Sequence, residues 1–485
     1  MKNCTITNRN TTMDTKTLRQ KILDLAIHGK LVPQDPNDEP ASVLLERIKA
    51  EKERLIKEGK IKRSKKSAKS SDTPHYENVP FEVPESWVWC KLDDLAYVGT
   101  GATPLTKRKD YYYKGEIAWI NSSSTSAPYI DKASNFITQK AISETNCVIY
   151  PKGTLILAMY GEGKTRGQIS ELLIEAATNQ ACAAICPFLQ ETKEYIKIFF
   201  ESNYLHLRTL AEGGTQPNLN LGKISNYDIP FPPIGEQNRI VVEIKRRFAL
   251  VDIIERGKEN LQTAIKQTKS KILDLAIHGK LVPQDPTDEP ASELLKRINP
   301  KAEITCDNPQ YGKLPKGWCS CTLRNVCSFT NGFAFSSDAY KNNGIPLVRI
   351  SNITNEGKID LNSCVYIQDE IDEQYIIEKG DFLVAMSGAT TGKMGVYTYG
   401  EISYLNQRVG KIKASKALYT PYMHYLMYSQ VDNILKMAYG GAQPNISAKA
   451  ILAIRILLPP LAEQQRIVAK IEDLFTQLDK IEASL

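Results

Sequence analysis

Residues 21–48 read KILDLAIHGKLVPQDPNDEPASVLLERI, and residues 271–298 read KILDLAIHGKLVPQDPTDEPASELLKRI. The two copies differ only at Asn37/Thr287, Val43/Glu293 and Glu46/Lys296, so 25 of 28 positions match at a constant offset of 250 residues. Solenoid repeats have far shorter periods, of roughly 20 to 50 residues. The stretch therefore predicts a chain built from two large, similar halves.

The length and composition agree with two domains. A chain of 485 residues is too long for a single core, and 42% hydrophobic with 24% charged residues is an ordinary globular composition. The net charge of +7 and a pI of about 8.7 favour an anionic partner such as nucleic acid, although many basic enzymes share these values.

The sequence predicts a protein of the cytoplasm. It has no apolar run of about 18 residues, and its first residues lack the apolar centre of a secretory signal, so no membrane partner is expected. The ten cysteines and five histidines do not form paired sets at zinc-ligand spacing. We therefore expect reduced cysteines and no metal site.

Landmarks outside the repeat align the two halves as well. Trp87 matches Trp318 at an offset of 231, and Asn179-Gln180 matches Asn406-Gln407 at an offset of 227. The motif GGTQPN at 213–218 matches GGAQPN at 440–445 at that same offset. These matches predict two copies of one mixed α/β fold whose surfaces have diverged.

Each predicted domain is followed by a proline pair and a helix with apolar residues at heptad spacing. The helices begin in PPIGEQNRIVVEI from Pro232 and in PPLAEQQRIVAKI from Pro459. Steps of four and three residues predict a coiled-coil core, although polar residues occupy three of the positions, Arg247, Lys258 and Thr268. The predicted core positions are Ile240, Ile244, Val251, Ile254, Leu261, Ile265, Ile272, Leu275, Ile467, Ile471, Leu474, Leu478 and Ile481.

The central helix is expected to run from Glu236 to His278 and to span about 64 Å at 1.5 Å per residue. It fuses the start of one helical arm to the end of another, and the two terminal pieces together would form a second, antiparallel arm. The expected fold is therefore α+β, with two mixed α/β domains separated by a long antiparallel coiled coil. Its repeats follow a circular order around a pseudo-two-fold axis.

The motifs resemble a known family. KILDLAIHGKLVPQ, the GTQPNL and GAQPNI elements, and PP-x-x-EQ-x-RIV are similar to the conserved regions of the specificity (S) subunits of type I restriction–modification enzymes. The resemblance covers essentially the whole chain, with the motifs in the family's circular order. It implies a non-catalytic, DNA-binding subunit whose two target recognition domains each read one half of a bipartite asymmetric site in double-stranded DNA.

The resemblance also implies partners and their cofactors. Two methyltransferase (M) subunits would methylate adenine with S-adenosylmethionine, and two restriction (R) subunits would translocate and cleave DNA with ATP. They would dock on the flanks of the coiled coil and on the KILDLAIHGKLV turns. No cofactor is expected on this chain itself.

The alignment predicts seven segments. They are an N-terminal conserved helical arm (1–48), a basic linker (49–75), target recognition domain 1 (76–233), the central conserved long helix and turn (234–298), a linker (299–309), target recognition domain 2 (310–460) and the C-terminal conserved helix (461–485). Residues 49–69 hold ten Lys or Arg and three Glu, which fits a solvated linker or a phosphate-binding tract. The second half lacks this stretch, so the shared function does not need it.

Motifs for catalysis are missing from the sequence. The proline pairs are preceded by Phe231 and Leu458, unlike the N-P-P-[YF] element of amino-methyltransferases. GEGKT at 161–165 is the nearest approach to a phosphate-binding loop, but Ala158 occupies the position of its first glycine. We therefore interpret that stretch, and its counterpart from Gly388, as loops of the recognition fold.

Candidate DNA contacts combine cations for phosphates with planar or hydroxyl side chains for bases. The alternative is a solvated loop whose aromatic residues lie in the core. Gln216 and Gln443 occur in both halves and are predicted to hold the junction between domain and helix. The candidates are Thr103, Lys107, Arg108, Lys109, Tyr111, Tyr112, Lys114, Lys164, Arg166 and Gln180 in the first half, and Phe335, Ser336, Ser337, Tyr340, Lys341, Arg349, Asn352, Lys393, Gln407 and Arg408 in the second.

Two other classes of function remain open at this point. A structural coiled-coil spacer that displays adhesive or sugar-binding modules would have no DNA affinity, whereas a DNA reader binds less tightly as salt increases. A free-standing DNA enzyme would transfer methyl groups without any other subunit.

Overall fold

The computed structural model describes residues 14–61, 79–161, 164–212, 219–305, 314–438 and 444–485. The described residues divide into two compact units, which we call the N-terminal unit (14–257) and the C-terminal unit (258–485). Helix α8 (Ile234–Ile277) contributes its first part to one unit and its last part to the other. Gln216, Gln443, Glu162, Gly163 and the end of the basic stretch lie outside the described residues.

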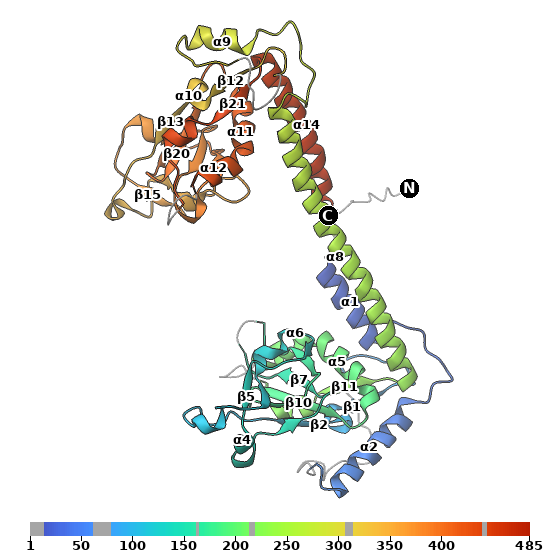
Figure 1. Ribbon diagram of the computed structural model, residues 1–485. Coiled ribbons are helices and arrows are strands. Elements are labelled where there is room, and N and C mark those ends of the chain that lie inside the picture. The colour runs from blue at the N-terminus through green and yellow to red at the C-terminus, as the bar shows by residue number, and fades with distance from the viewer. Residues whose placement is uncertain (1–13, 62–78, 162–163, 213–218, 306–313, 439–443) are drawn as a thin grey trace. The chain divides into compact units, whose positions relative to one another are not determined.

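In the N-terminal unit, helix α1 (Thr15–Ile27) lies along the first part of α8 in the antiparallel direction (Figure 1). Asp14 caps its start by accepting a hydrogen bond from the backbone N–H of Lys16 over 3.1 Å. Gly29 ends it with a φ of +65°, a left-handed conformation that glycine adopts without steric cost. The apolar face of α1 packs on α8 and the recognition domain in one core.

The recognition domain of this unit consists of small sheets covered by helices. Within the described residues a five-stranded sheet has the order β2-β10-β7-β8-β4, a four-stranded sheet has the order β5-β3-β9-β6, and β1 pairs with β11. The elements are β1 (Val88–Lys91), β2 (Ala96–Thr100), β3 (Ile117–Ile120), β4 (Tyr129–Ile130), β5 (Asn135–Ile137), β6 (Ile149–Tyr150), β7 (Leu155–Ala158), β8 (Ile169–Leu172), β9 (Ala176–Thr178), β10 (Cys182–Pro187), β11 (Asp228–Phe231), α2 (Ala41–Lys57), α3 (Leu92–Leu95), α4 (Gln139–Glu144), α5 (Lys193–Ser202), α6 (Tyr204–Glu212) and α7 (Leu221–Ser225).

The C-terminal unit repeats this plan. Its described strands form the orders β13-β20-β17-β18 and β15-β14-β19-β16, and β12 pairs with β21. The elements are β12 (Cys319–Thr322), β13 (Cys327–Asn331), β14 (Ile345–Val348), β15 (Val365–Ile367), β16 (Ile376–Ile377), β17 (Phe382–Ala385), β18 (Met394–Val396), β19 (Ser403–Leu405), β20 (Val409–Ala414), β21 (Arg455–Leu458), α9 (Ala291–Ile298), α10 (Leu323–Val326), α11 (Thr420–Ser429), α12 (Val431–Ala438), α13 (Ala448–Leu452) and α14 (Leu461–Ala483).

The two strand orders correspond element by element, so the prediction of two copies of one fold is confirmed. The order β2-β10-β7-β8 in the N-terminal unit corresponds to β13-β20-β17-β18 in the C-terminal unit. In the other sheet of each unit, β3 pairs with β9 and β14 pairs with β19, and both pairs are parallel. Strand β4 extends the larger sheet of the N-terminal unit by a parallel pair with β8. The surfaces differ while the frame is kept.

The last part of α8 pairs with α14, again in the antiparallel direction (Figure 1). Lys269 donates to Asp479 over 2.6 Å, and Lys258 near the start of this part donates to the backbone carbonyl of Leu485. The long helix predicted for 236–278 is therefore present, and each unit holds one pair of antiparallel helices. Within the described residues, no helix is both long enough and apolar enough to cross a membrane.

Most of the predicted heptad positions are in the helix interfaces. Seven are fully buried: Ile240, Ile244, Val251, Ile265, Ile272, Ile467 and Ile471. Leu275, Leu474 and Leu478 are half-buried.

The heptad prediction is wrong at three positions, where Ile254, Leu261 and Ile481 are 36%, 40% and 45% exposed. All three lie where a short helix reaches its end. The described part of α1 begins at Thr15, which hydrogen-bonds Glu255, and α14 ends opposite Lys258. A heptad count extends the stripe along the whole of α8, whereas the partner helices cover only part of it.

The helices are fixed to each recognition domain by the same junction. The indole N–H of Trp87 donates to the buried carboxylate of Glu236 over 2.8 Å, and Trp318 donates to Glu463 over 3.0 Å. Burial raises the pKa of both carboxyl groups, and hydrogen bonds from the tryptophans and from Gln34 or Gln284 oppose that rise.

An ion pair completes each junction. Arg239 binds both oxygens of Asp38 at 3.2 and 2.6 Å, and Arg466 binds both oxygens of Asp288 at 3.2 and 2.7 Å. The acidic partners come from the repeated stretch, and the arginines come from the helix that follows each domain. The two copies of the repeated stretch thus keep the aspartate that binds the helix after each domain.

Candidate nucleic-acid interface

Most of the predicted contacts of the N-terminal unit lie on the loop between β2 and β3. Gly101 starts the loop, and a Cβ there would lie 1.7 Å from the backbone oxygen of Thr178, so only glycine permits this approach. As a result Thr103 reaches Gln180, and its hydroxyl donates to the side-chain oxygen of Gln180 over 2.6 Å. The structure brings these two candidates together although 77 residues separate them.

Arg108 is held within the protein by carboxylates. Its guanidinium donates two hydrogen bonds to Asp110, at 2.9 and 2.7 Å, and a third to Glu144 at 3.2 Å. Hydrogen bonds from Arg108 and, to a smaller extent, from Lys140 lower the pKa of Asp110. This network joins the loop to helix α4 and leaves Arg108 few free donors.

Tyr111 and Tyr112 pack inward. Tyr111 is buried beneath the guanidinium of Arg108, whose carbon lies 4.4 Å from the ring centre, and its hydroxyl donates to Glu144 over 3.0 Å. Tyr112 donates to the backbone oxygen of Pro104 over 2.5 Å and meets Trp119 edge to face. Both rings therefore fit the alternative reading, in which the loop's aromatic residues belong to its own core.

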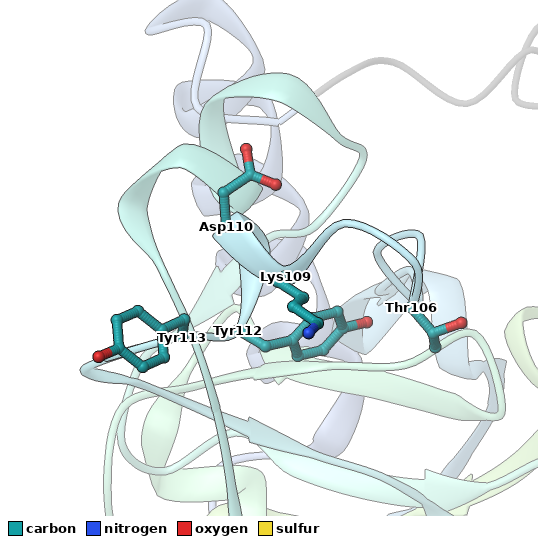
Figure 2. Close-up of a pocket in the computed structure, with 5 residues that line it drawn as sticks. All are labelled: Thr106, Lys109, Asp110, Tyr112 and Tyr113. Atoms are coloured by element: carbon teal, nitrogen blue, oxygen red, sulfur yellow. The ribbon is translucent and has the colours of Figure 1, made fainter.

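The remaining side chains of the loop face solvent. Lys107, Lys109 and Lys114 are exposed, and so is Tyr113, which belongs to the same tyrosine cluster in the sequence but was not among the predicted contacts. Figure 2 shows Tyr113 and Thr106 at opposite ends of a shallow hollow, with Lys109 and Tyr112 between them. Lys164 and Arg166 lie on a different loop, between β7 and β8, where their backbone carbonyls accept from Tyr204 and Arg208.

The C-terminal unit builds its loop in the same way. Gly332 lies against the backbone of Asn406, where a Cβ would be 2.1 Å from the carbonyl oxygen. Phe333 then donates its N–H to Leu405 and accepts from the N–H of Gln407, each over 2.8 Å. The candidates Gln407 and Arg408 are exposed beside this loop.

The loop of the C-terminal unit carries a cluster of aromatic rings where the loop of the N-terminal unit carries cations. Phe333 contacts Phe335 and Tyr375 with ring centres 4.9 and 5.4 Å apart, and Phe335 stacks on Tyr404 at 6.1 Å. Phe333 is exposed at the edge of this cluster and was not among the predicted contacts. Its only sequence signal was the glycine before it, which matches Gly101.

The other candidates of this unit fall into two groups. Ser336, Ser337, Tyr340, Lys341 and Arg349 lie on or beside the loop, where the guanidinium carbon of Arg349 is 5.7 Å from the ring centre of Tyr340. Asn352 and Lys393 are set apart from it.

Asn352 is buried, and both ends of its side-chain amide are bonded internally, to the N–H of Arg349 and the carbonyl of Asp360, each over 2.9 Å. Its role is to close a turn of the backbone. Lys393 lines a second hollow with Glu356 and Tyr428. Among the described residues, no three His, Cys, Asp or Glu side chains lie close enough together to hold a metal ion.

Comparison with known proteins decides the family. The model of the type I restriction modification DNA specificity domain matches residues 84–263 and again residues 315–485, which together make up more than half of the chain. The chain belongs to this family.

Two relatives of the specificity family align over nearly the whole chain. The EcoAI specificity subunit of Escherichia coli is 30% identical over 96% of this chain and 90% of its own length. The EcoEI specificity subunit of Escherichia coli is 28% identical over 97% of this chain and 90% of its own length.

Solved structures share the fold of this specificity subunit. The HsdS subunit from Thermoanaerobacter tengcongensis gives a TM-score of 0.50 at 18% identity, covering 83% of this chain and 92% of that one. A chain from a study of complex assembly and conformational transition of the type I R-M system gives 0.56 at 18% identity, covering 83% and 93%. At such identities the likeness shows the fold alone.

Family membership confirms the main predictions. The chain is a specificity subunit with two target recognition domains and a role in DNA sequence specificity, and the catalytic activities belong to other subunits of the complex. Specificity subunits of type I systems bind DNA and assemble with methyltransferase and restriction subunits. The candidate loops therefore belong to the domains that read DNA, while their individual contacts remain predictions.

Proposed function

We propose that this specificity subunit reads a bipartite, asymmetric sequence in double-stranded DNA, with one half-site for each target recognition domain. The observation that carries the proposal is that the two units share the same junction between domain and helix but differ in their exposed loops. Both units repeat the junction of Trp87 with Glu236, at Trp318 and Glu463, whereas their exposed loops differ in chemistry. One frame can dock at two places on a duplex, and different loops then select different bases.

The two loops offer different chemistry to DNA. The N-terminal loop presents three lysines and Tyr113, and the C-terminal loop presents Phe333, Ser336 and Ser337. Lysines bind phosphates through charge, and aromatic or hydroxyl groups contact base edges in the major groove. Two dissimilar half-sites are the expected result.

The proposal includes the stoichiometry and cofactors of the complex. Two methyltransferase subunits and two restriction subunits assemble on this chain, and S-adenosylmethionine and ATP bind to those subunits and not to this one. An exposed apolar face of α8 supports docking of the methyltransferases. Val242, Leu250 and Ile253 on this face are exposed, which is unusual for large apolar side chains of a helix that packs elsewhere.

Mapping methylated adenines tests the proposal. The chain is expressed with its methyltransferase in a host that lacks other adenine methylation, and the modified positions are read from the whole genome. We expect two dissimilar specified sequences separated by an unspecified gap. A continuous motif, or one with two identical halves, would contradict it.

The purified chain provides a second test. Without other subunits, and with DNA and S-adenosylmethionine present, it should transfer no methyl group. Its DNA affinity should fall linearly with the logarithm of salt concentration. Methyl transfer by the chain alone would favour a free-standing enzyme, and no DNA affinity at any salt concentration would favour a structural spacer.

A further inference from the structure

We infer that Tyr113 contacts the bases of the first half-site, and that Arg108, Tyr111 and Tyr112 are positioning residues that hold its loop in shape. The inference rests on the proposed function and deepens it by naming a specificity-determining side chain. It reverses the simplest reading of the sequence, in which the arginine and the first two tyrosines touch DNA.

The position of Tyr113 carries the first step. Its side chain is 71% exposed, at one end of an open hollow of about 750 Å³ whose other lining residues are Thr106, Lys109, Asp110 and Tyr112 (Figure 2). A large aromatic ring left in water loses the stabilisation that burial would give it. Tyrosine contributes much contact area at binding surfaces for little lost side-chain freedom, which suits a residue kept exposed for a partner.

The backbone holds Tyr113 at this place. The next residue, Lys114, has a φ of +55° and is the one non-glycine residue with a left-handed φ in the described part of the chain. That conformation is sterically strained in a residue with a Cβ. Gly115 follows against the backbone of Ile137, where a Cβ would come within 2.7 Å. Strain of this kind persists where the surroundings impose it and is concentrated at functional sites.

The neighbouring candidates are already satisfied within the protein. The guanidinium of Arg108 binds Asp110 at two points, Tyr111 donates to Glu144, and Tyr112 donates to the carbonyl of Pro104. These internal bonds use the hydroxyl donors of Tyr111 and Tyr112 and three of the five N–H donors of Arg108. Their bonds instead fix a rigid loop, and a rigid loop loses little freedom on binding.

Two cations flank the exposed ring. Lys109 lines the hollow, and the amine of Lys114 lies 5.7 Å from the centre of the Tyr113 ring. In the major groove an aromatic side chain reaches base edges, and the thymine methyl above all, while lysines alongside bind the phosphates. Tyr113 is therefore the residue of this loop that distinguishes sequences, and the lysines contribute affinity for any duplex.

The test uses the full chain together with its methyltransferase. After the wild-type motif is known, each position of both half-sites is varied in a set of duplexes, and the relative rate of methylation is measured for each. Tyr113→Ala should relax the preference about tenfold at one or two adjacent positions of the first half-site and leave the second half-site unchanged. Leu205→Ala, which truncates a side chain 66% exposed on α6, should change neither half-site.

A second pair of variants tests the positioning role. Arg108→Ala should relax preference over the whole first half-site, because the loop loses its network, and the intact second half-site shows that the C-terminal unit is folded. Arg108→Lys keeps a cation beside Asp110 and should restore most of that preference. If Arg108→Lys loses one base position as sharply as Tyr113→Ala does, Arg108 reads that base and the assignment is wrong.

The outcomes separate this inference from the proposed function. A split motif for the wild type with equal rates for Tyr113→Ala on all sequences, or with an equal loss on all sequences, overturns the assignment of Tyr113 alone. A wild type without a split motif overturns the proposed function, and the assignment fails with it.

Discussion

The indole N–H of Trp87 donates a hydrogen bond to the buried carboxylate of Glu236 over 2.8 Å, joining the first residues of the recognition domain to the helix that follows it. Trp87→Phe removes the donor and leaves one carboxylate oxygen buried without a partner. We expect it to destabilise the N-terminal unit by about 1 to 3 kcal/mol. The free energy of unfolding in urea measures the loss.

A matched variant checks that the buried carboxylate is the reason. Trp119→Phe also removes an indole donor, here to the neutral carbonyl of Ala102 at 3.1 Å on a half-buried side chain. It should cost less, about 1 kcal/mol. Equal losses of unfolding free energy for the two variants would mean that the bond from Trp87 stabilises the protein no more than the bond from Trp119.

The same junction predicts a dependence of stability on pH. Burial raises the pKa of Glu236 and Glu463 above the value of an unfolded chain, so the folded protein binds these protons more tightly. Their stabilising contribution is then complete below the unfolded pKa and is lost as pH rises through the folded pKa. Unfolding of the wild type in urea between pH 4 and pH 8 should show this loss.

The double variant Glu236→Gln, Glu463→Gln serves as the comparison. Glutamine does not titrate, so the difference in unfolding free energy between wild type and variant should change with pH in that window, in favour of the wild type at the acid end. A difference that stays constant from pH 4 to pH 8 would show that the two carboxyl groups keep an ordinary pKa.

Gly29 follows helix α1 in the repeated stretch, and Gly59 follows helix α2, so the two glycines can be compared as helix ends. Their φ values are +65° and +70°, but a Cβ on Gly29 would lie 2.5 Å from Pro84, whereas a Cβ on Gly59 would meet nothing within 4 Å. Gly59→Ala should cost about 1 kcal/mol, from the backbone conformation alone. Gly29→Ala should cost about 1 to 3 kcal/mol more through steric overlap. Equal unfolding free energies in urea would show that Pro84 moves aside freely.

The repeat and its spacing predicted most of the frame. The stretch at 21–48 and its copy predicted the two units, because residues that close a unit on itself, such as Asp38 and Asp288, must be kept together with their partners. The heptad count placed the interface correctly at Ile240 and Ile467 but failed at Ile254 and Leu261. Periodicity gives the face of a helix, and only the fold shows how far the neighbouring helix extends.

The recognition loop could be predicted only in part. Three cations and three tyrosines in a row mark a candidate DNA contact, but the sequence cannot show which of them the protein itself uses. Arg108 is held by Glu144, 36 residues away, and that contact depends on the packing of α4. Tyr113 is exposed next to the left-handed backbone of Lys114, a conformation that no residue preference predicts.

The exposed apolar face of α8 predicts where the methyltransferase binds. Ile253 is 58% exposed, so Ile253→Glu should leave the free energy of unfolding almost unchanged while placing a charge in an apolar interface. Copurification of the methyltransferase with the chain should fall at least tenfold. Gln262→Glu adds the same charge at an exposed polar position of the same helix and should copurify normally. If both variants keep the partner, the methyltransferase binds elsewhere.

The length of α8 predicts the gap between the half-sites. Seven residues inserted after Gly257 add about 10 Å to the helix and nearly two full turns, so the faces on either side keep almost the same orientation. A Cβ at Gly257 would meet nothing within 4 Å, so the insertion point itself is not packed against a neighbour. If α8 acts as a spacer, the gap in the methylated motif should lengthen by about three base pairs, at roughly 3.4 Å each, with both half-sites unchanged. Seven residues inserted at Gly380, in an open turn between β16 and β17, should leave the gap as it was. A changed half-site with an unchanged gap in the α8 variant would contradict the role of the helix as a spacer.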